Sequence, residues 1–87
     1  MAIADYLNAL SFFKKSDNRV GQARVYNNIG NLYLEIDFDE SLEYLQKGLI
    51  MAQQLGNDKL LASAYLNIGN VYQKKKNFDK KEALTKK

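Results

Sequence analysis

The sequence contains no cysteine and no histidine among its 87 residues. Their absence excludes the usual zinc ligand sets, disulfide frameworks, thiol nucleophiles and imidazole acid or base catalysts. A serine nucleophile is excluded as well, because Ser41 has no histidine to activate it. We therefore expect a protein that is not an enzyme and that requires no cofactor and no metal.

Proline and long apolar runs are also missing from the chain. The longest apolar stretch is far too short to cross a membrane, and the first residues lack the basic region and long apolar run of a signal peptide. The composition of 46% hydrophobic and 26% charged residues is typical of soluble globular domains. Together with the lack of cysteine, this leads us to expect a cytoplasmic protein without a membrane segment.

Charge is unevenly distributed along the sequence. Residues 1–43 contain four basic and seven acidic side chains, a net charge of −3, whereas residues 44–87 contain nine basic and three acidic ones, a net charge of +6. Lysine clusters at 74–76, 80–81 and 86–87 account for most of the excess. They could attract an acidic partner or nucleic acid, but lysines also suit the last turn of a helix, where they oppose the helix dipole. We favour the second explanation and expect no binding to nucleic acid.

Apolar residues recur at spacings of three and four, for example at Phe38, Leu42, Leu45 and Leu49. This period predicts α-helix along nearly the whole chain. Short polar residues and glycine interrupt the pattern and divide it into five helices. The predicted helices cover residues 2–15, 20–36, 39–55 and 59–76, with a short fifth helix from residue 79.

The interruptions also predict how individual helices begin and end. Asp39 and Asp58 are predicted to cap the third and fourth helices, since short acidic side chains accept hydrogen bonds from free backbone N–H groups. Gly56 is predicted to end the third helix in the left-handed conformation. Asn77, which tolerates the same conformation, is predicted to end the fourth.

The chain contains an internal repeat. Residues 23–33 align with residues 62–72 at an offset of 39, and seven of the eleven positions are identical. Self-similarity at this period indicates an array of helical hairpins. The predicted units are residues 18–56 and residues 57–87, whose last helix is short, preceded by the second helix of another unit in residues 1–17.

Both copies resemble the first helix of the tetratricopeptide repeat, with an aromatic residue, a large apolar residue, glycine and tyrosine at fixed spacing. The matching residues are Tyr26, Ile29, Gly30 and Tyr33, and Tyr65, Ile68, Gly69 and Tyr72. The second helix of that repeat is matched by Ser41, Leu45 and Gly48, and by Ala2, Tyr6 and Ala9. The resemblance implies an all-α fold in which antiparallel helix pairs stack as a short right-handed α-solenoid. A repeat of about 40 residues without proline is similar to the long-helix subclass, which includes Pins-like, kinesin-light-chain-like and bacterial signalling proteins.

Two glycines stand inside predicted helices. Gly30 and Gly69 each cost about 1 kcal/mol relative to alanine in a helix interior. Close approach of a neighbouring helix explains such glycines, because a missing side chain lets two backbones come together. We predict that each packs against the second helix of its own unit, where Ser41 and Gly48 offer small surfaces to Gly30.

In the tetratricopeptide family the first helices line a concave groove, so the resemblance implies that groove residues bind a segment of a partner protein. Asn28, Asn31, Asn67 and Asn70 are predicted to form a ladder there, because a side-chain amide can both donate to and accept from a peptide backbone. The complete predicted peptide-binding set is Arg24, Asn27, Asn28, Asn31, Glu35, Ser63, Leu66, Asn67, Asn70 and Lys74. The alternative is that the asparagines are intramolecular and bridge neighbouring helices.

These features predict a non-enzymatic protein–protein interaction scaffold. The alternative is a self-associating or domain-swapped structural fragment of a larger tetratricopeptide protein. A homo-oligomer through uncapped ends is expected because the first helix carries apolar residues such as Phe12 and Phe13 and no polar capping repeat precedes it. Exchange of a hairpin across the short turn at Asp37 is a second route to such an assembly.

Overall fold

A computed structural model describes residues 3–85, with the side chains of residues 3–81. The described residues form four α-helices and no strand: α1 (Ile3–Lys15), α2 (Arg19–Tyr33), α3 (Phe38–Leu55) and α4 (Asp58–Thr85). The predicted all-α helical-repeat fold is therefore confirmed. Ala2 and the lysines at 86–87, which entered the sequence predictions, lie outside the described residues.

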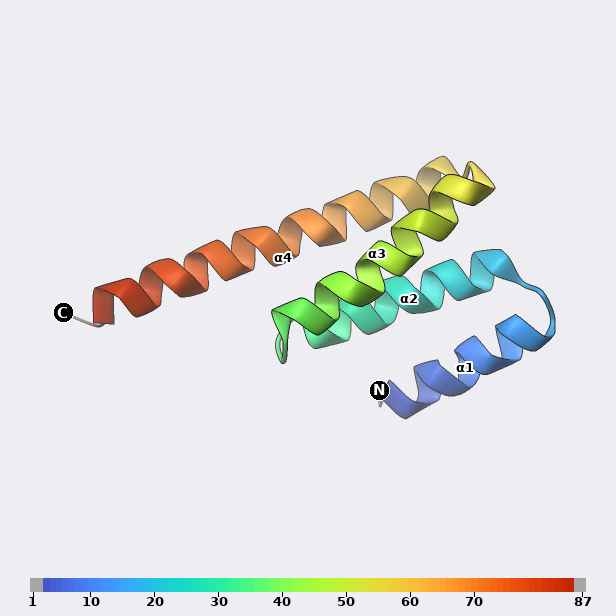
Figure 1. The fold of residues 1–87 in the computed structure, drawn as a ribbon, viewed down its shortest axis with the longest axis horizontal. Coiled ribbons are helices and arrows are strands. Elements are labelled where there is room, and N and C mark those ends of the chain that lie inside the picture. Colours follow the sequence, from blue (N-terminus) through green and yellow to red (C-terminus); the bar gives the residue numbers. More distant parts are fainter. Residues whose placement is uncertain (1–2, 86–87) are drawn as a thin grey trace.

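The helices follow one another as an antiparallel stack (Figure 1). α2 packs between α1 and α3, and α3 in turn packs between α2 and α4. α4 is much longer than the others, and its C-terminal half projects past them as a single arm. The molecule is correspondingly elongated, with extents of 54 × 27 × 15 Å.

α1 and α3 end in the same way. Asp17 and Gly56, which occupy equivalent positions of the repeat, have positive φ angles of 54° and 63°. In each case the next N–H bonds back to a carbonyl five residues earlier, from Asn18 to Phe13 at 2.8 Å and from Asn57 to Ala52 at 3.2 Å. This is the Schellman arrangement, which satisfies carbonyl groups that the helix end leaves free. The prediction for Gly56 is confirmed.

The caps that begin α3 and α4 differ from those predicted. The N-cap of α3 is Asp37, whose carboxylate accepts from the N–H groups of Asp39 and Glu40. At the start of α4 the Oδ1 atom of Asn57 accepts from the N–H of Leu60 at 3.1 Å, so Asn57 and not Asp58 provides the cap. In both places the cap is the residue that directly precedes the helix. Only this residue has the non-helical backbone conformation that directs its side chain at the free N–H groups.

The core is built around α2 and the face of α3 that covers it. Ile29 and Leu45 are completely buried, and the ring of Tyr44 lies parallel to that of Tyr33, with 5.6 Å between centroids. Burial of side chains of this size removes about 25 cal/mol of unfavourable hydration per Å² of apolar surface, so this interface is a major source of stability.

Gly30 lies at the closest approach of α2 and α3. A Cβ atom added there would stand 2.5 Å from Cγ of Leu45 and 3.2 Å from the carbonyl oxygen of Ser41. The predicted close packing at Gly30 is thus confirmed. At Gly69 it is wrong, because an added Cβ would meet nothing within 4 Å.

α4 continues where a turn was expected. The predicted break at Asn77 and the separate fifth helix are wrong, since Asp58–Thr85 is one helix. Asparagine costs only about 0.7 kcal/mol in a helix interior, so a small gain elsewhere keeps it helical. Such a gain is available at the start of α3, where Phe38 meets Phe78 edge to face with 6.1 Å between ring centroids.

Candidate peptide-binding groove

A groove of about 430 Å³ runs between α2 and the first half of α4. Its residues come from corresponding positions of the two helices, together with the turn before α4. They are Arg24, Asn27, Asn28, Asn31, Asn57, Lys59, Leu60, Ser63, Leu66 and Asn67. Seven of the ten residues predicted for the peptide site therefore lie in one groove.

The groove walls differ in how far their side chains reach solvent. On α2, Asn28 and Asn31 are exposed, and on α4, Asn67 is half-buried. Leu66 is 66% exposed and adds an apolar surface beside these amides. The groove thus combines hydrogen-bonding groups that can both donate and accept with the apolar side chains of Leu60 and Leu66, which is the usual make-up of a binding site.

Asn27 is placed differently from the other groove asparagines. Its side chain is only 7% exposed, and its Oδ1 atom is buried without a hydrogen-bond partner among the described residues. It lies against α3, because a Cβ added to Gly48 would stand 3.2 Å from Oδ1 of Asn27. An unsatisfied buried acceptor costs about 1–3 kcal/mol, so Asn27 carries a stability cost that a structural role does not explain.

Three predicted site residues lie outside this groove. Glu35 and Lys74 form an ion pair with each other, which joins the α2–α3 turn to α4 and leaves both residues beside a second pocket. Asn70 is exposed and does not line either pocket. Three of the four asparagines that were predicted to form a ladder therefore line the groove, and the fourth, Asn70, does not.

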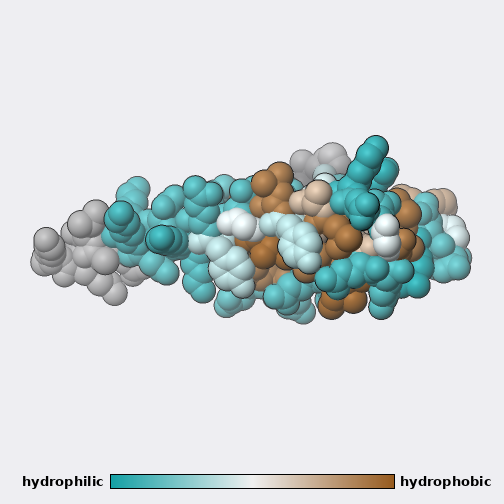
Figure 2. Space-filling view, turned by 90° about the horizontal axis from the view of Figure 1, so that it is seen from above, coloured by the Kyte–Doolittle hydropathy of each residue, from teal (hydrophilic) through white to brown (hydrophobic). Residues whose placement is uncertain are grey.

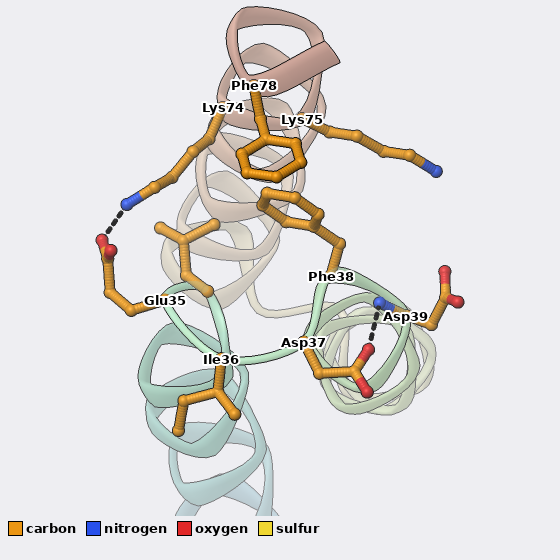
Figure 3. Close-up of a pocket in the computed structure, with 9 residues that line it drawn as sticks. Glu35, Ile36, Asp37, Phe38, Asp39, Lys74, Lys75 and Phe78 are labelled. Atoms are coloured by element: carbon orange, nitrogen blue, oxygen red, sulfur yellow. Dashed lines mark hydrogen bonds and ion pairs between the residues drawn. The ribbon is translucent and has the colours of Figure 1, made fainter. Parts of the chain in front are cut away.

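The second pocket, of about 560 Å³, lies between the α2–α3 turn and the middle of α4 (Figure 3). Phe38 and Phe78 line it and contact each other edge to face, and the Glu35–Lys74 ion pair lies at one side. Ile36 stands on the turn and is largely exposed. This pocket exists because α4 continues past Asn77, so sequence reasoning that ended the helix there could not have found it.

Sequence reasoning also missed three residues of the α2–α4 groove: Asn57, Lys59 and Leu60. A signal for one of them was present, because Lys59 precedes Ser63 by four residues and so shares its helix face. Lys59 and Arg24 are the two charged residues that line the groove, and both are positively charged.

Other site chemistries find little support in the described part of the chain. No group of three or more carboxylates that could hold a metal ion occurs among these residues. No described helix is both long enough and apolar enough to span a membrane. Two surface pockets of the described residues remain as candidate sites.

Comparison with known proteins gives one finding for residues 62–84. They match the family model of the tetratricopeptide repeat. No curated protein and no solved structure matches the chain significantly. The matched residues all lie on α4, and they include Tyr65, Gly69 and Tyr72, the residues that repeat the pattern of α2. The matched segment, 23 of the 87 residues, is thus similar to a tetratricopeptide repeat, and α2 carries the same residue pattern.

Proposed function

We propose that this protein is a non-catalytic interaction scaffold that holds a short peptide segment of a partner protein in the groove between α2 and α4. The observation that carries the proposal is the meeting of Asn28, Asn31 and Asn67 in one groove although they come from two different helices. Tetratricopeptide repeats suggest protein partners in general, and this groove suggests where one would bind. The amides suit the backbone of the segment, since backbone groups also donate and accept.

The charges of the groove favour an acidic segment. Arg24 and Lys59 stand on its two walls, and no acidic side chain lines it. Opposite charges raise the rate of encounter and suppress binding of basic competitors. Leu66 would receive an apolar side chain of the segment beside the backbone contacts.

We also propose that the repeat units are residues 18–56 and residues 57–87, and that they are of the long-helix type. Support comes from the left-handed residues Asp17 and Gly56, which end α1 and α3 at equivalent positions of the sequence repeat. In a repeat of the common tetratricopeptide length, about 34 residues, the second left-handed residue would follow Asp17 about five residues earlier than Gly56 does, which is more than one helical turn.

A binding assay with synthetic peptides tests the groove. Fluorescent decapeptides of acidic, neutral and basic composition would be titrated with the protein, and we expect weak binding that is strongest for the acidic peptides. Replacement of Asn28 and Asn67 by alanine removes two neutral hydrogen bonds of about 1 kcal/mol each, so affinity should fall about thirtyfold. Circular dichroism should show unchanged helicity.

The matched control replaces Asn8 and Asn70, two exposed asparagines outside the groove, by alanine. This pair should bind the peptides like the unmodified protein. Equal loss of affinity in both double variants, or loss that follows only a fall in folded protein, would show that the groove amides are not the contact.

A further inference from the structure

The outward face of α4 is uncovered. Tyr65 and Tyr72 are 57% and 56% exposed, and Gly69 between them has open space around it. The corresponding residues of α2 are Tyr26, Gly30 and Tyr33, and α3 covers them. Seen from above, the molecule shows apolar residues over its central part and hydrophilic residues along the arm (Figure 2).

α1 has the complementary character. Its residues Tyr6, Ala9 and Phe12 stand one repeat before Leu45, Gly48 and Met51, residues of the α3 face that lies near α2. In α1 this face is only partly used, since Tyr6 and Ala9 are half-buried and Phe12 is 65% exposed. One chain thus exposes counterparts of both surfaces that form the α2–α3 interface. The counterpart of the α2 surface lies on α4, and the counterpart of the α3 surface lies on α1.

We propose that α4 of one copy binds α1 of a second copy, so that the chains join head to tail and repeat the α2–α3 interface between molecules. The occupant of the α4 face is therefore a second copy of this chain. The internal interface sets the register: Leu45 covers Gly30, so Tyr6 of the second copy covers Gly69. A Cβ on Gly48 would stand 3.2 Å from Oδ1 of Asn27, 3.3 Å from the carbonyl oxygen of Ala23 and 3.4 Å from Cβ of Tyr26. Ala9, the counterpart of Gly48, would therefore lie against the counterparts of these residues, Leu66, Ala62 and Tyr65.

A symmetric pairing of two α4 faces is less favourable. α4 carries six lysines, two aspartates and one glutamate, a net charge of +3, whereas α1 carries two lysines and one aspartate, a net charge of +1. Pairing α4 with α1 therefore brings together less positive charge than pairing two α4 helices, so the two surfaces repel each other less. Because the head-to-tail contact joins two different faces, it leaves a free face at each end and builds an open chain of molecules.

The residues replaced to test this contact lie outside the peptide groove, although Leu66 borders both surfaces. Ser63 and Asn67 of the groove lie on one side of the buried stripe of α4 formed by Leu60, Ala64 and Val71, whereas Tyr65 and Gly69 lie on the other. Self-association can therefore be tested without changing the asparagines of the groove. The two proposals are tested by different variants and can fail separately.

Sedimentation velocity with two blocked variants tests the inference. Gly69→Gln fills the open space on α4, and Phe12→Glu places a charge on the exposed face of α1. The unmodified protein should form species larger than a dimer as its concentration rises towards the millimolar range. Each variant alone should lower the association constant at least tenfold, and a 1:1 mixture of the two should form a heterodimer, because one intact face of each kind remains.

Matched controls use exposed neighbours outside the proposed contact. Leu7→Glu on α1 and Asn70→Gln on α4 should associate like the unmodified protein. Tyr65→Glu provides a second block of the α4 face and should act like Gly69→Gln. Association that survives in Phe12→Glu would favour symmetric pairing of α4 and would overturn the proposal. An unmodified protein that stays monomeric at millimolar concentration, or a mixture of variants that stays monomeric, would overturn it as well.

Discussion

The hydroxyl group of Ser41 donates a hydrogen bond to the carbonyl oxygen of Gly30 at 2.6 Å, at a point where both groups are buried. α2 tightens just after this point, because the N–H of Leu34 bonds to the carbonyl of Asn31 at 3.3 Å. Leu34 would supply the regular α-helical donor for Gly30, so Ser41 replaces that donor from the neighbouring helix. The small residue of α3 therefore has a polar role in addition to leaving room.

Replacement of Ser41 by alanine should leave this carbonyl buried without its donor. We expect the free energy of unfolding to fall by about 1–3 kcal/mol, measured by urea denaturation. Ser63→Ala, at an exposed position on α4, is the control and should stay within about 0.5 kcal/mol of the unmodified protein. A loss no larger than that of the control would show that water or another donor satisfies Gly30.

The two repeat glycines should respond oppositely to alanine. Gly30→Ala forces Leu45 to move, since the added Cβ would lie 2.5 Å from its Cγ atom, and should cost about 1–3 kcal/mol. Gly69→Ala meets open space and should gain about 1 kcal/mol from helix propensity. Thermal melts at low protein concentration, where the chain is monomeric, measure both changes, and equal shifts in the two variants would contradict the packing described for α2 and α3.

Asn27→Leu should stabilise the fold. Leucine branches at Cγ like asparagine and removes a buried acceptor without a partner among the described residues, so unfolding should require about 1–3 kcal/mol more. The corresponding residue of the next repeat, Leu66, is already leucine. If peptide affinity also falls in this variant, Asn27 contributes to the groove. Asn28→Leu, at an exposed position, is the control and should give no comparable gain in stability.

Phe78→Ala should loosen the arm of α4 without unfolding the molecule. The edge-to-face contact with Phe38 is worth about 0.5–1.5 kcal/mol beyond the apolar area that it buries. Hydrogen exchange at the backbone of residues 74–81 should therefore become faster, while exchange at the buried Leu45 and Ile29 stays unchanged. Lys75→Ala, at an exposed position of the same segment, should leave exchange close to that of the unmodified protein.

Much of the fold could be predicted because local signals and the repeat agree. The break at residues 16–18 and the left-handed Gly56 were predictable from residue type, and the position of Gly30 followed from its place in the repeat. α2 ends three residues before its predicted end at Ile36, because the N–H groups of Ile36 and Asp37 both turn back to the carbonyl of Tyr33.

The error at Asn77 has a physical cause that lies beyond local sequence. A hairpin forms there only if the residues that follow can cover Gly69 and Tyr72, and Lys80 and Lys81 stand where Glu40 and Ser41 stood in the first unit. Bulky charged side chains cannot reproduce the buried hydrogen bond of Ser41. The straight helix instead gains Phe38 and the Glu35–Lys74 ion pair, neither of which can be inferred from a pattern within one helix.

The clustering of the predicted site residues could be predicted to the level of a helix face but not of individual side chains. Asn28 and Asn67 share a groove because the repeat places them at equivalent positions on α2 and α4. Asn70 is exposed and does not line the groove, although its counterpart Asn31 does. The sequence spacing places both residues on a helix face, but how two helices pack against each other also depends on the side chains between them.

Because α4 is one continuous helix, a tilt at its packed half displaces its projecting end. From Val71, the last completely buried residue of α4 among those whose side chains are described, to Thr85 the axis extends about 21 Å at ~1.5 Å per residue. A segment wedged between α2 and α4 that tilted α4 by about 10° would swing the tip through about 4 Å by simple rotation of this rigid arm. Occupation of the groove near Asn67 would thus be felt at the far end of the molecule as displacement, with the Phe38–Phe78 contact as the point where that motion is resisted.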